Sequence, residues 1–243
     1  MAVPPVEAAP AAGENGDIPD THTAAPTAQF VLFDGFDPLD VVAPYEVLIA
    51  GSDAMGGGLQ LRMVTAEGPR MVTSGTPGIS LEATAALDPE LPGYIFVAGA
   101  AGSVEGDPDA GDETIPVLLS RFAQSSAAEA MRQALANPQV TVVTVRGGGL
   151  ALAMAGLLEG RTATTHVLGQ DLLEATGTEV VRARGVDDGD LISAGGVTSG
   201  LDAALYLLAR EFGPHIAHEV EKLFEYERRG TVWTTTAAKA HSA

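Results

Sequence analysis

The sequence predicts an α/β fold in which helices cover both faces of a mostly parallel sheet. Short, fully apolar segments typical of buried strands alternate along the chain with longer segments of helical spacing. Strands separated by helices pair in parallel through right-handed crossovers. Three glycine-rich loops, at residues 99–102, 147–149 and 195–196, follow predicted strands. Ligands bind at that end of the strands in such folds, so we expect the functional site there.

Six segments are predicted as strands. The strongest is 140–145 (VTVVTV), because every residue is β-branched. The others are 30–33, 59–64, 94–97, 179–181 and 191–193.

Helical spacing of apolar residues predicts the helices between these strands. Pro44 is expected to kink or restart the first helix, and Asn137-Pro138 to end the second. The predicted helices cover residues 39–48, 115–136, 150–158, a segment after His166, 197–210 and 215–224.

The composition predicts one domain between two tails. Residues 1–28 are rich in Ala, Pro and Gly without apolar periodicity, which is typical of a disordered tail. Residues 29–233 carry the strand and helix pattern as a single domain, and residues 234–243 are expected to form a flexible C-terminal tail. We see no signal peptide and no apolar run of about 18 residues, so we expect a cytoplasmic protein without a membrane span.

The charge and the missing cysteine exclude several function classes. The chain has 13 Lys and Arg against 32 Asp and Glu, a formal net charge of −19. Nucleic acids and anionic membranes bind clustered basic residues, so neither is expected as a partner. With no Cys, the chain has no thiolate nucleophile or thiolate metal ligand. We expect no metal and no cofactor.

Several residues near the predicted strand ends are candidates for chemistry. The turn at Gly147, Gly148 and Gly149 suits either an anion site at a helix N-terminus or a tight turn without a ligand. Glu46, in the first helix near Asp40, could act as a general acid or base if burial raises its pKa. His166, after Thr165, could be an acid-base group or a hydrogen-bonded residue at a helix start.

Five segments of the chain carry a family pattern. They are residues 39–47 (LDVVAPYEV), 155–161 (AGLLEGR), 163–166 (ATTH), 194–202 (AGGVTSGLD) and 224–233 (FEYERRGTVW). Together they resemble the glutamine-amidotransferase-like superfamily that contains the parkinsonism-associated deglycase, related intracellular proteases and isonitrile hydratase. The last segment resembles the branch that includes isonitrile hydratase and the amidotransferase-like halves of arabinose-regulator-type transcription factors. The resemblance extends over about residues 29–233.

The resemblance implies a flavodoxin-like sandwich, a homodimer, and a nucleophilic Cys at a strained strand-to-helix elbow beside an acidic residue. Here the elbow position is Arg146, the acid position is assigned to Glu46, and Asp40 would be a second acid nearby. A Pro-Gly-Gly turn of the family is replaced by Ala98-Gly99-Ala100. Arginine is permanently protonated and cannot replace the thiolate, so thiol-dependent mechanisms are excluded.

Two functions follow from this site. The first is a cofactor-independent enzyme of hydratase, lyase or cyclase type that acts on a small organic molecule. The second is a non-catalytic protein that binds a small anion through Arg146 and the glycine-rich loops. Arg146 would either pair with Glu46 or turn outward to a ligand carboxylate. In the enzyme, the N–H groups of Gly148 and Gly99 are expected to stabilise an oxyanion. The expected catalytic residues are Glu46 (as the proton-transfer group), Asp40 and His166, and the expected substrate-binding residues are Arg146, Gly147, Gly148, Gly99, Ala100 and Thr165.

Overall fold

An eight-stranded sheet runs through the centre of the molecule. The computed structural model describes residues 25–235. The strand order is β12-β10-β11-β7-β6-β1-β2-β5, and every pair is parallel except β10 with β11. The strands are β1 (Thr27–Val31), β2 (Gln60–Thr65), β5 (Ala85–Ala86), β6 (Gly93–Val97), β7 (Val140–Val145), β10 (Gly185–Asp187), β11 (Leu191–Ala194) and β12 (Trp233–Thr234).

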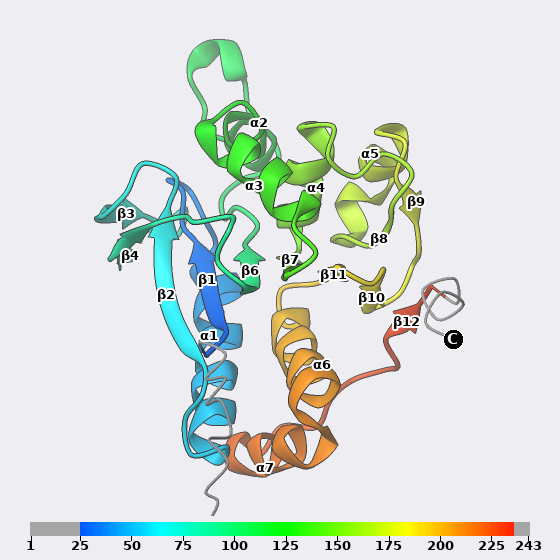
Figure 1. Cartoon of the computed structure of the whole chain (residues 1–243). Coiled ribbons are helices and arrows are strands. Elements are labelled where there is room, and N and C mark those ends of the chain that lie inside the picture. The colour runs from blue at the N-terminus through cyan, green and yellow to red at the C-terminus, as the bar shows by residue number, and fades with distance from the viewer. Residues whose placement is uncertain (1–24, 236–243) are drawn as a thin grey trace, which may run out of the picture.

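Helices cover the two faces of this sheet as separate layers (Figure 1). One layer is formed by α1 (Pro38–Ala54), α6 (Ser199–Phe212) and α7 (Pro214–Phe224). The other is formed by α2 (Ile115–Ala123), α3 (Ser126–Ala136), α4 (Gly147–Met154) and α5 (Gln170–Ala175). The expected α/β fold, a flavodoxin-like sandwich with a mostly parallel sheet, is confirmed.

Alternate residues of the central strands feed the two cores. Phe30 and Phe96 stack at 4.6 Å on the α1, α6 and α7 side, while Ile95 and Val142 pack beneath α2 and α4. Both sets are buried, which explains why these strands read as continuous apolar runs.

Short elements complete the fold. These are the hairpin of β3 (Arg70–Thr73) and β4 (Ser80–Ala83), the parallel pair β8 (Thr162–Ala163) and β9 (Glu179–Val180), and the 3-10 turns η1 (Pro108–Ala110) and η2 (Val167–Gly169). No helix within residues 25–235 has the length and apolar character needed to cross a membrane.

The structure corrects three details of the sequence prediction. The single helix predicted at 115–136 is two helices, because the Ser125 side chain accepts a hydrogen bond from the Ala127 N–H (3.2 Å) and so caps α3. Of the two outcomes expected at Pro44, the restart is wrong, because α1 continues through this buried residue. β1 begins at Thr27, so the last residues of the predicted N-terminal tail belong to the domain, while residues 1–24 and 236–243 lie outside the described part.

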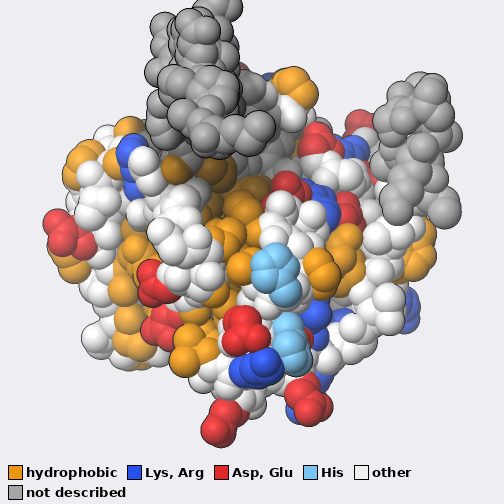
Figure 2. Space-filling model, turned by 60° about the horizontal axis from the view of Figure 1, so that its bottom comes forward, with side chains coloured by type: hydrophobic (Ala, Val, Ile, Leu, Met, Phe, Trp, Pro, Cys, Tyr) orange, Lys and Arg blue, Asp and Glu red, His pale blue; other side chains and the backbone are white. Residues whose placement is uncertain are grey.

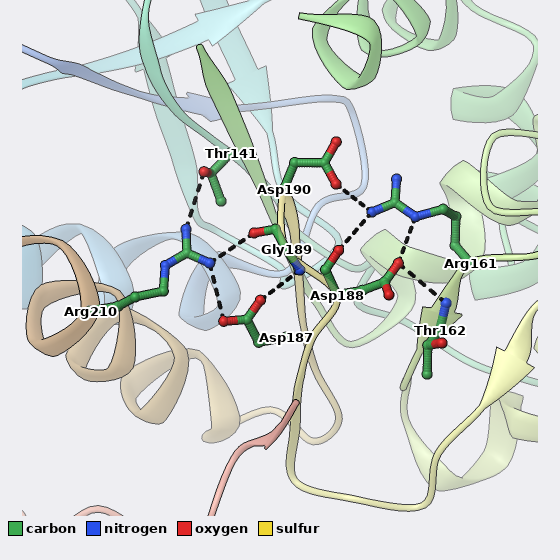
Figure 3. A network of polar contacts seen from close by, with 8 residues as sticks. All are labelled: Thr141, Arg161, Thr162, Asp187, Asp188, Gly189, Asp190 and Arg210. Carbon is green, nitrogen blue, oxygen red and sulfur yellow. Dashed lines mark hydrogen bonds and ion pairs between the residues drawn. The ribbon is translucent and has the colours of Figure 1, made fainter. Parts of the chain in front are cut away.

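An arginine network holds the antiparallel hairpin of β10 and β11 (Figure 3). Arg210 of α6 donates to the Asp187 carboxylate (3.2 Å), to the Gly189 carbonyl (2.8 Å) and to the Thr141 hydroxyl (3.2 Å). On the other side of the turn, Arg161 pairs with Asp188 (2.6 Å) and Asp190 (2.5 Å). Each of the three acidic side chains in the turn, Asp187, Asp188 and Asp190, thus contacts one of these two arginines.

Apolar side chains also reach the surface. The face seen when the bottom of the molecule is turned forward mixes them with acidic, basic and histidine side chains (Figure 2). On α1, Leu39 and Ile49 are 47% and 38% exposed. Part of the apolar surface of α1 is therefore not packed against any other described residue.

Candidate active site

The candidate site lies where the central parallel strands end. The N-terminus of α1 follows β1, the Gly99 loop follows β6, and Arg146 follows β7 directly. The Asp37 N–H donates to the Gly99 carbonyl at 2.8 Å, which joins the first two segments. The three segments therefore meet at one edge of the sheet, as predicted for this class of fold.

Arg146 occupies a strained elbow between β7 and α4. Its backbone has φ 52° and ψ −122°, a conformation that residues with a side chain rarely adopt. The Arg146 N–H donates to the Ala194 carbonyl (2.9 Å), and the Thr165 hydroxyl donates to the Arg146 carbonyl (2.6 Å). Bonds on both sides thus hold the elbow in place.

The glycines after the elbow allow close packing. They form the first turn of α4, and none of them has a positive φ. A Cβ atom on Gly148 would lie 2.1 Å from the Val97 carbonyl oxygen, so any side chain there would collide with β6. Of the two alternatives for this turn, the tight left-handed turn of glycines is wrong, because the glycines begin α4 and the positive φ lies at Arg146.

The guanidinium of Arg146 pairs with Asp37, which the sequence analysis did not single out. The two side chains are 14% and 15% exposed, and Nη1 of Arg146 donates to Oδ2 of Asp37. Asp37 is also the N-cap of α1, accepting from the Leu39 N–H at 3.0 Å. Its signal in the sequence is an Asp directly before Pro38, which suits an N-cap followed by a proline in the first turn.

Asp40 is the buried acid of the site. Its Oδ2 accepts from the Gly99 N–H at 3.0 Å and lies 3.9 Å from Nη1 of Arg146. Its Oδ1 is buried with no hydrogen-bond partner in residues 25–235. Burial raises the pKa of Asp40 from 3.8 to about 7, with Asp37 adding to the rise and Arg146 and the Gly99 N–H opposing it. Asp40 can therefore hold or release a proton near neutral pH.

Glu46 does not share this environment. Its side chain is exposed on α1, and no hydrogen bond or ion pair joins it to another described residue. The expectation that Glu46 is buried is wrong, because its side chain lies on the exposed side of α1. The expected pair between Arg146 and Glu46 is replaced by the pair with Asp37.

His166 lies at the mouth of the site and caps a short turn. Its Nδ1 accepts from the Leu168 N–H at 3.3 Å, so Nε2 carries the proton of the neutral ring. Burial lowers the pKa of His166, and the nearby Arg146 charge lowers it further. The ring is thus neutral and hydrogen-bonded at a helix start, one of the two alternatives raised by the sequence.

An apolar pocket of about 340 Å³ opens beside Arg146. Among the described residues, its ionisable lining side chains are Arg146 and His166. The lining residues are Ala100, Val104, Ile115, Pro116, Leu119, Arg146, Gly147, Leu150, Met154, Thr165, His166, Leu168, Gly169 and Leu172. A cavity of this size and character suits a small, mostly apolar molecule.

The predicted site residues divide into three groups. Arg146, Gly147, Ala100, Thr165 and His166 line the pocket. Asp40 and Gly99 lie behind Arg146 and are bonded to each other, so the Gly99 N–H expected to bind an oxyanion is already engaged. Gly148 is buried against β6, and Glu46 is outside the site. No cluster of three or more acidic or histidine side chains suited to a metal ion occurs in the part of the chain described.

A larger hollow, about 860 Å³, lies behind the segment that follows α7. Its buried acid, Asp202, already binds Arg184 (2.6 Å), the Tyr226 hydroxyl (3.0 Å) and the Arg229 N–H (2.8 Å). This arrangement ties the C-terminal segment to α6. The smaller pocket is the better candidate, because it adjoins the strained elbow and the acid with a shifted pKa.

This chain is similar to known proteins in sequence and in fold. The DJ-1/PfpI family matches residues 117–210. An isonitrile hydratase of Pseudomonas putida is 35% identical over 198 residues, covering 81% of this chain and 77% of that protein. The HTH-type transcriptional regulator CdhR of Pseudomonas aeruginosa is 27% identical over 198 residues, covering 80% of this chain but about half (53%) of the regulator.

A solved structure supports the same relationship at the level of the fold. A THiJ/PfpI family protein from Pseudomonas syringae superposes with a TM-score of 0.69 at 24% identity, covering 90% of this chain and 84% of that one. Together with the identity to the isonitrile hydratase over most of both proteins, these findings show that the chain belongs to the DJ-1/PfpI family.

Proposed function

We propose that this protein is a cofactor-independent, hydratase-type enzyme that adds water to a small, mostly apolar organic molecule, with Asp40 as the proton-transfer group. The relationship to an isonitrile hydratase supports the reaction type and makes isonitriles the first substrates to test. The non-catalytic alternative is not favoured, because this relative is named as an enzyme.

The observation that carries the proposal is the environment of Asp40. A carboxyl group with a pKa of about 7 is present in both protonation states at neutral pH, which suits a general acid that must also act as a base. Its Oδ1 is buried and has no partner among the described residues, so a substrate or water could bond to this oxygen once Arg146 moves aside. The pocket next to it supplies an apolar surface for the rest of the molecule.

Hydration without a thiolate needs only proton transfers and water. Protonated Asp40 gives its proton to the isonitrile carbon, and water attacks the same carbon. The Asp40 carboxylate then takes a proton from the added water, and the product tautomerises to an N-substituted formamide. One water is consumed, and Asp40 ends in the state in which it began.

Arg146 controls access to Asp40. The guanidinium covers the carboxyl group from the pocket side, with Nη1 at 3.9 Å from Asp40 Oδ2. A substrate therefore reaches Asp40 when Arg146 moves within the pocket, and its charge then lies beside the reacting group. A guanidinium there would stabilise negative charge on the substrate but cannot act as a nucleophile.

Two amide variants on α1 test the assignment. Asp40→Asn is expected to lower kcat/KM for an apolar isonitrile by about 100-fold or more, as loss of a general acid-base group does. Glu46→Gln is the matched variant, since it removes an exposed acid from the same helix, and it is expected to stay near the wild-type value. Formamide production is measured by chromatography, and circular dichroism verifies folding.

The opposite pattern would support the assignment made from the sequence. If Glu46→Gln loses activity and Asp40→Asn does not, Glu46 is the proton-transfer group. If the wild-type protein hydrates no isonitrile across a panel of alkyl and aryl compounds, the proposed reaction is wrong.

A further inference from the structure

The pocket beside Arg146 differs in charge from the rest of the chain. The sequence holds 32 acidic residues against 13 Lys and Arg, yet no described acidic side chain lines this pocket. Its ionisable lining groups are Arg146 and His166, while Asp37 lies on the other side of the guanidinium. With the His166 ring neutral, the guanidinium of Arg146 is the charged group of the described lining, and a guanidinium binds carboxylates, so the pocket suits a ligand that carries a negative group.

Arg146 has hydrogen-bond donors that are free to bind the negative group of a ligand. Asp37 takes Nη1, whereas Nε and Nη2 have no hydrogen-bond partner within residues 25–235. Neither is among the sealed polar atoms, which in that range are Asp40 Oδ1 and Thr144 Oγ1. Nε and Nη2 form one edge of the planar guanidinium, and that edge matches the two oxygens of a carboxylate.

The distance between Arg146 and Asp40 limits where the reacting carbon can lie. Only 3.9 Å separates Arg146 Nη1 from Asp40 Oδ2. A carboxylate bound to the Nε–Nη2 edge and the Asp40 carboxyl group would then contact the same guanidinium, so a reacting group on the carbon next to that carboxylate is the one held nearest to the proton-transfer group. The remaining volume is bounded by Leu119, Leu150 and Met154, which suit an apolar side chain.

We infer that the substrate is a carboxylate that bears its reacting group on the adjacent carbon and an apolar side chain on that same carbon. Arg146 binds the carboxylate through Nε and Nη2, Asp40 faces the reacting group, and the apolar side chain fills the pocket. This inference rests on the proposed hydratase function and names its substrate class. For an isonitrile it specifies a 2-isocyano carboxylate over its decarboxylated counterpart.

Calorimetric binding to the full chain tests the inference without requiring turnover. The two probes are N-formylphenylalanine and N-(2-phenylethyl)formamide, which are hydration products that differ only in the carboxylate. N-formylphenylalanine is expected to bind at least tenfold more tightly. N-formylalanine, which keeps the carboxylate but lacks the large apolar side chain, is expected to bind at least tenfold more weakly than N-formylphenylalanine.

Variants connect this preference to Arg146. Arg146→Gly removes the guanidinium and suits the positive φ of the elbow, so the protein should fold, and the preference for the carboxylate should disappear. Arg146→Lys keeps the charge but loses the planar edge and should bind in between. Arg182→Ala removes an exposed cation distant in sequence and should change binding less than twofold.

The outcomes separate this inference from the proposed function. Equal binding of the two formamides, no binding of N-formylphenylalanine, or an undiminished preference in Arg146→Gly would overturn the inference. If the inference about the carboxylate is overturned but neutral isonitriles are hydrated in an Asp40-dependent way, the proposed hydratase function still stands. If the carboxylate preference depends on Arg146 but no isonitrile of either kind is hydrated, the ligand class stands and the hydratase function fails.

Discussion

Asp40 and Glu46 lie on one helix but face different surroundings. Six residues of α-helix correspond to a rotation of about 600°, which leaves Glu46 about 120° away from Asp40. Asp40 shares its side of α1 with the buried residues Pro44 and Val47, whereas Glu46 is exposed. This spacing is visible in the sequence, so the buried acid could have been identified from periodicity alone. The Asp37–Arg146 pair could not, because its partners are 109 residues apart in the chain.

Burial of Asp40 makes stability depend on pH. Its folded pKa of about 7 exceeds the ordinary value of 3.8, so the folded state holds the proton more tightly. Its contribution is therefore fully favourable below pH 3.8 and is lost as pH rises through about 7. We expect Asp40→Asn to be more stable than wild type at pH 8. The free energy of unfolding of the variant minus that of the wild type is expected to be up to about 4 kcal/mol larger at pH 8 than below pH 3.8.

Urea unfolding of both proteins between pH 5 and pH 8 measures about 2.5 kcal/mol of this difference, because the carboxyl group of the unfolded chain is already ionised at pH 5. Subtracting the variant from the wild type removes the contribution of the other acids. A difference that does not change with pH would mean that Asp40 has an ordinary pKa, and it would also weaken its proposed role as a proton-transfer group.

The backbone strain at Arg146 can be isolated with two truncations. Arg146→Ala and Arg146→Gly both remove the guanidinium and leave Asp37 unpaired, but only glycine adopts φ 52° and ψ −122° without steric cost. The glycine variant is expected to be more stable than the alanine variant by about 1–2 kcal/mol. Chemical denaturation compares them, and equal stabilities would show that the elbow relaxes when the arginine is removed.

At the scale of helices and strands, the sequence pattern predicts those elements whose position depends on residues close to them in the chain. The apolar runs that became β1, β6 and β7 were predicted within a few residues. The break between α2 and α3 depends on Ser125, a single cap inside an otherwise continuous apolar pattern. The antiparallel hairpin of β10 and β11 was not predicted. Its acidic turn is held by Arg210 and Arg161, which lie 21 and 27 positions away in the sequence from the turn residues they contact.

Removal of Arg210 should therefore weaken the hairpin. Asp187 is nearly buried and also accepts from the Tyr206 hydroxyl (2.6 Å), so Arg210→Ala would leave a carboxylate with its countercharge missing. We expect a loss of about 2–3 kcal/mol of unfolding free energy, somewhat less than for a fully buried pair. Arg132→Ala is the control, since its pair with Glu129 is exposed and should contribute less than about 0.5 kcal/mol. Equal losses in the two variants would show that the network adds nothing specific.

At the scale of the whole molecule, the sequence predicts the layered fold but not which helix faces remain exposed at the surface. Alternating apolar segments fix a sheet between two helical layers wherever each strand is buried on both sides. Which helix face remains exposed depends on how α1 packs against α6 and α7, and the local pattern does not contain that information. The exposed Leu39 and Ile49, with the half-buried Val42 between them, recur at spacings of three and seven along α1.

This stripe suits the homodimer that we propose for the protein. Burying it against a second copy would remove apolar surface from water, while two copies with a charge of −19 each repel one another. We therefore expect a mass of about 50 kDa, twice 24.8 kDa, in light scattering after gel filtration, with a dimer fraction that rises as salt screens the charge. Ile49→Asp should shift the protein to the monomer, whereas Leu223→Asp, at an exposed position on α7, should not. A monomer at all salt concentrations would rule out the dimer, and a dimer unaffected by Ile49→Asp would move its interface away from α1.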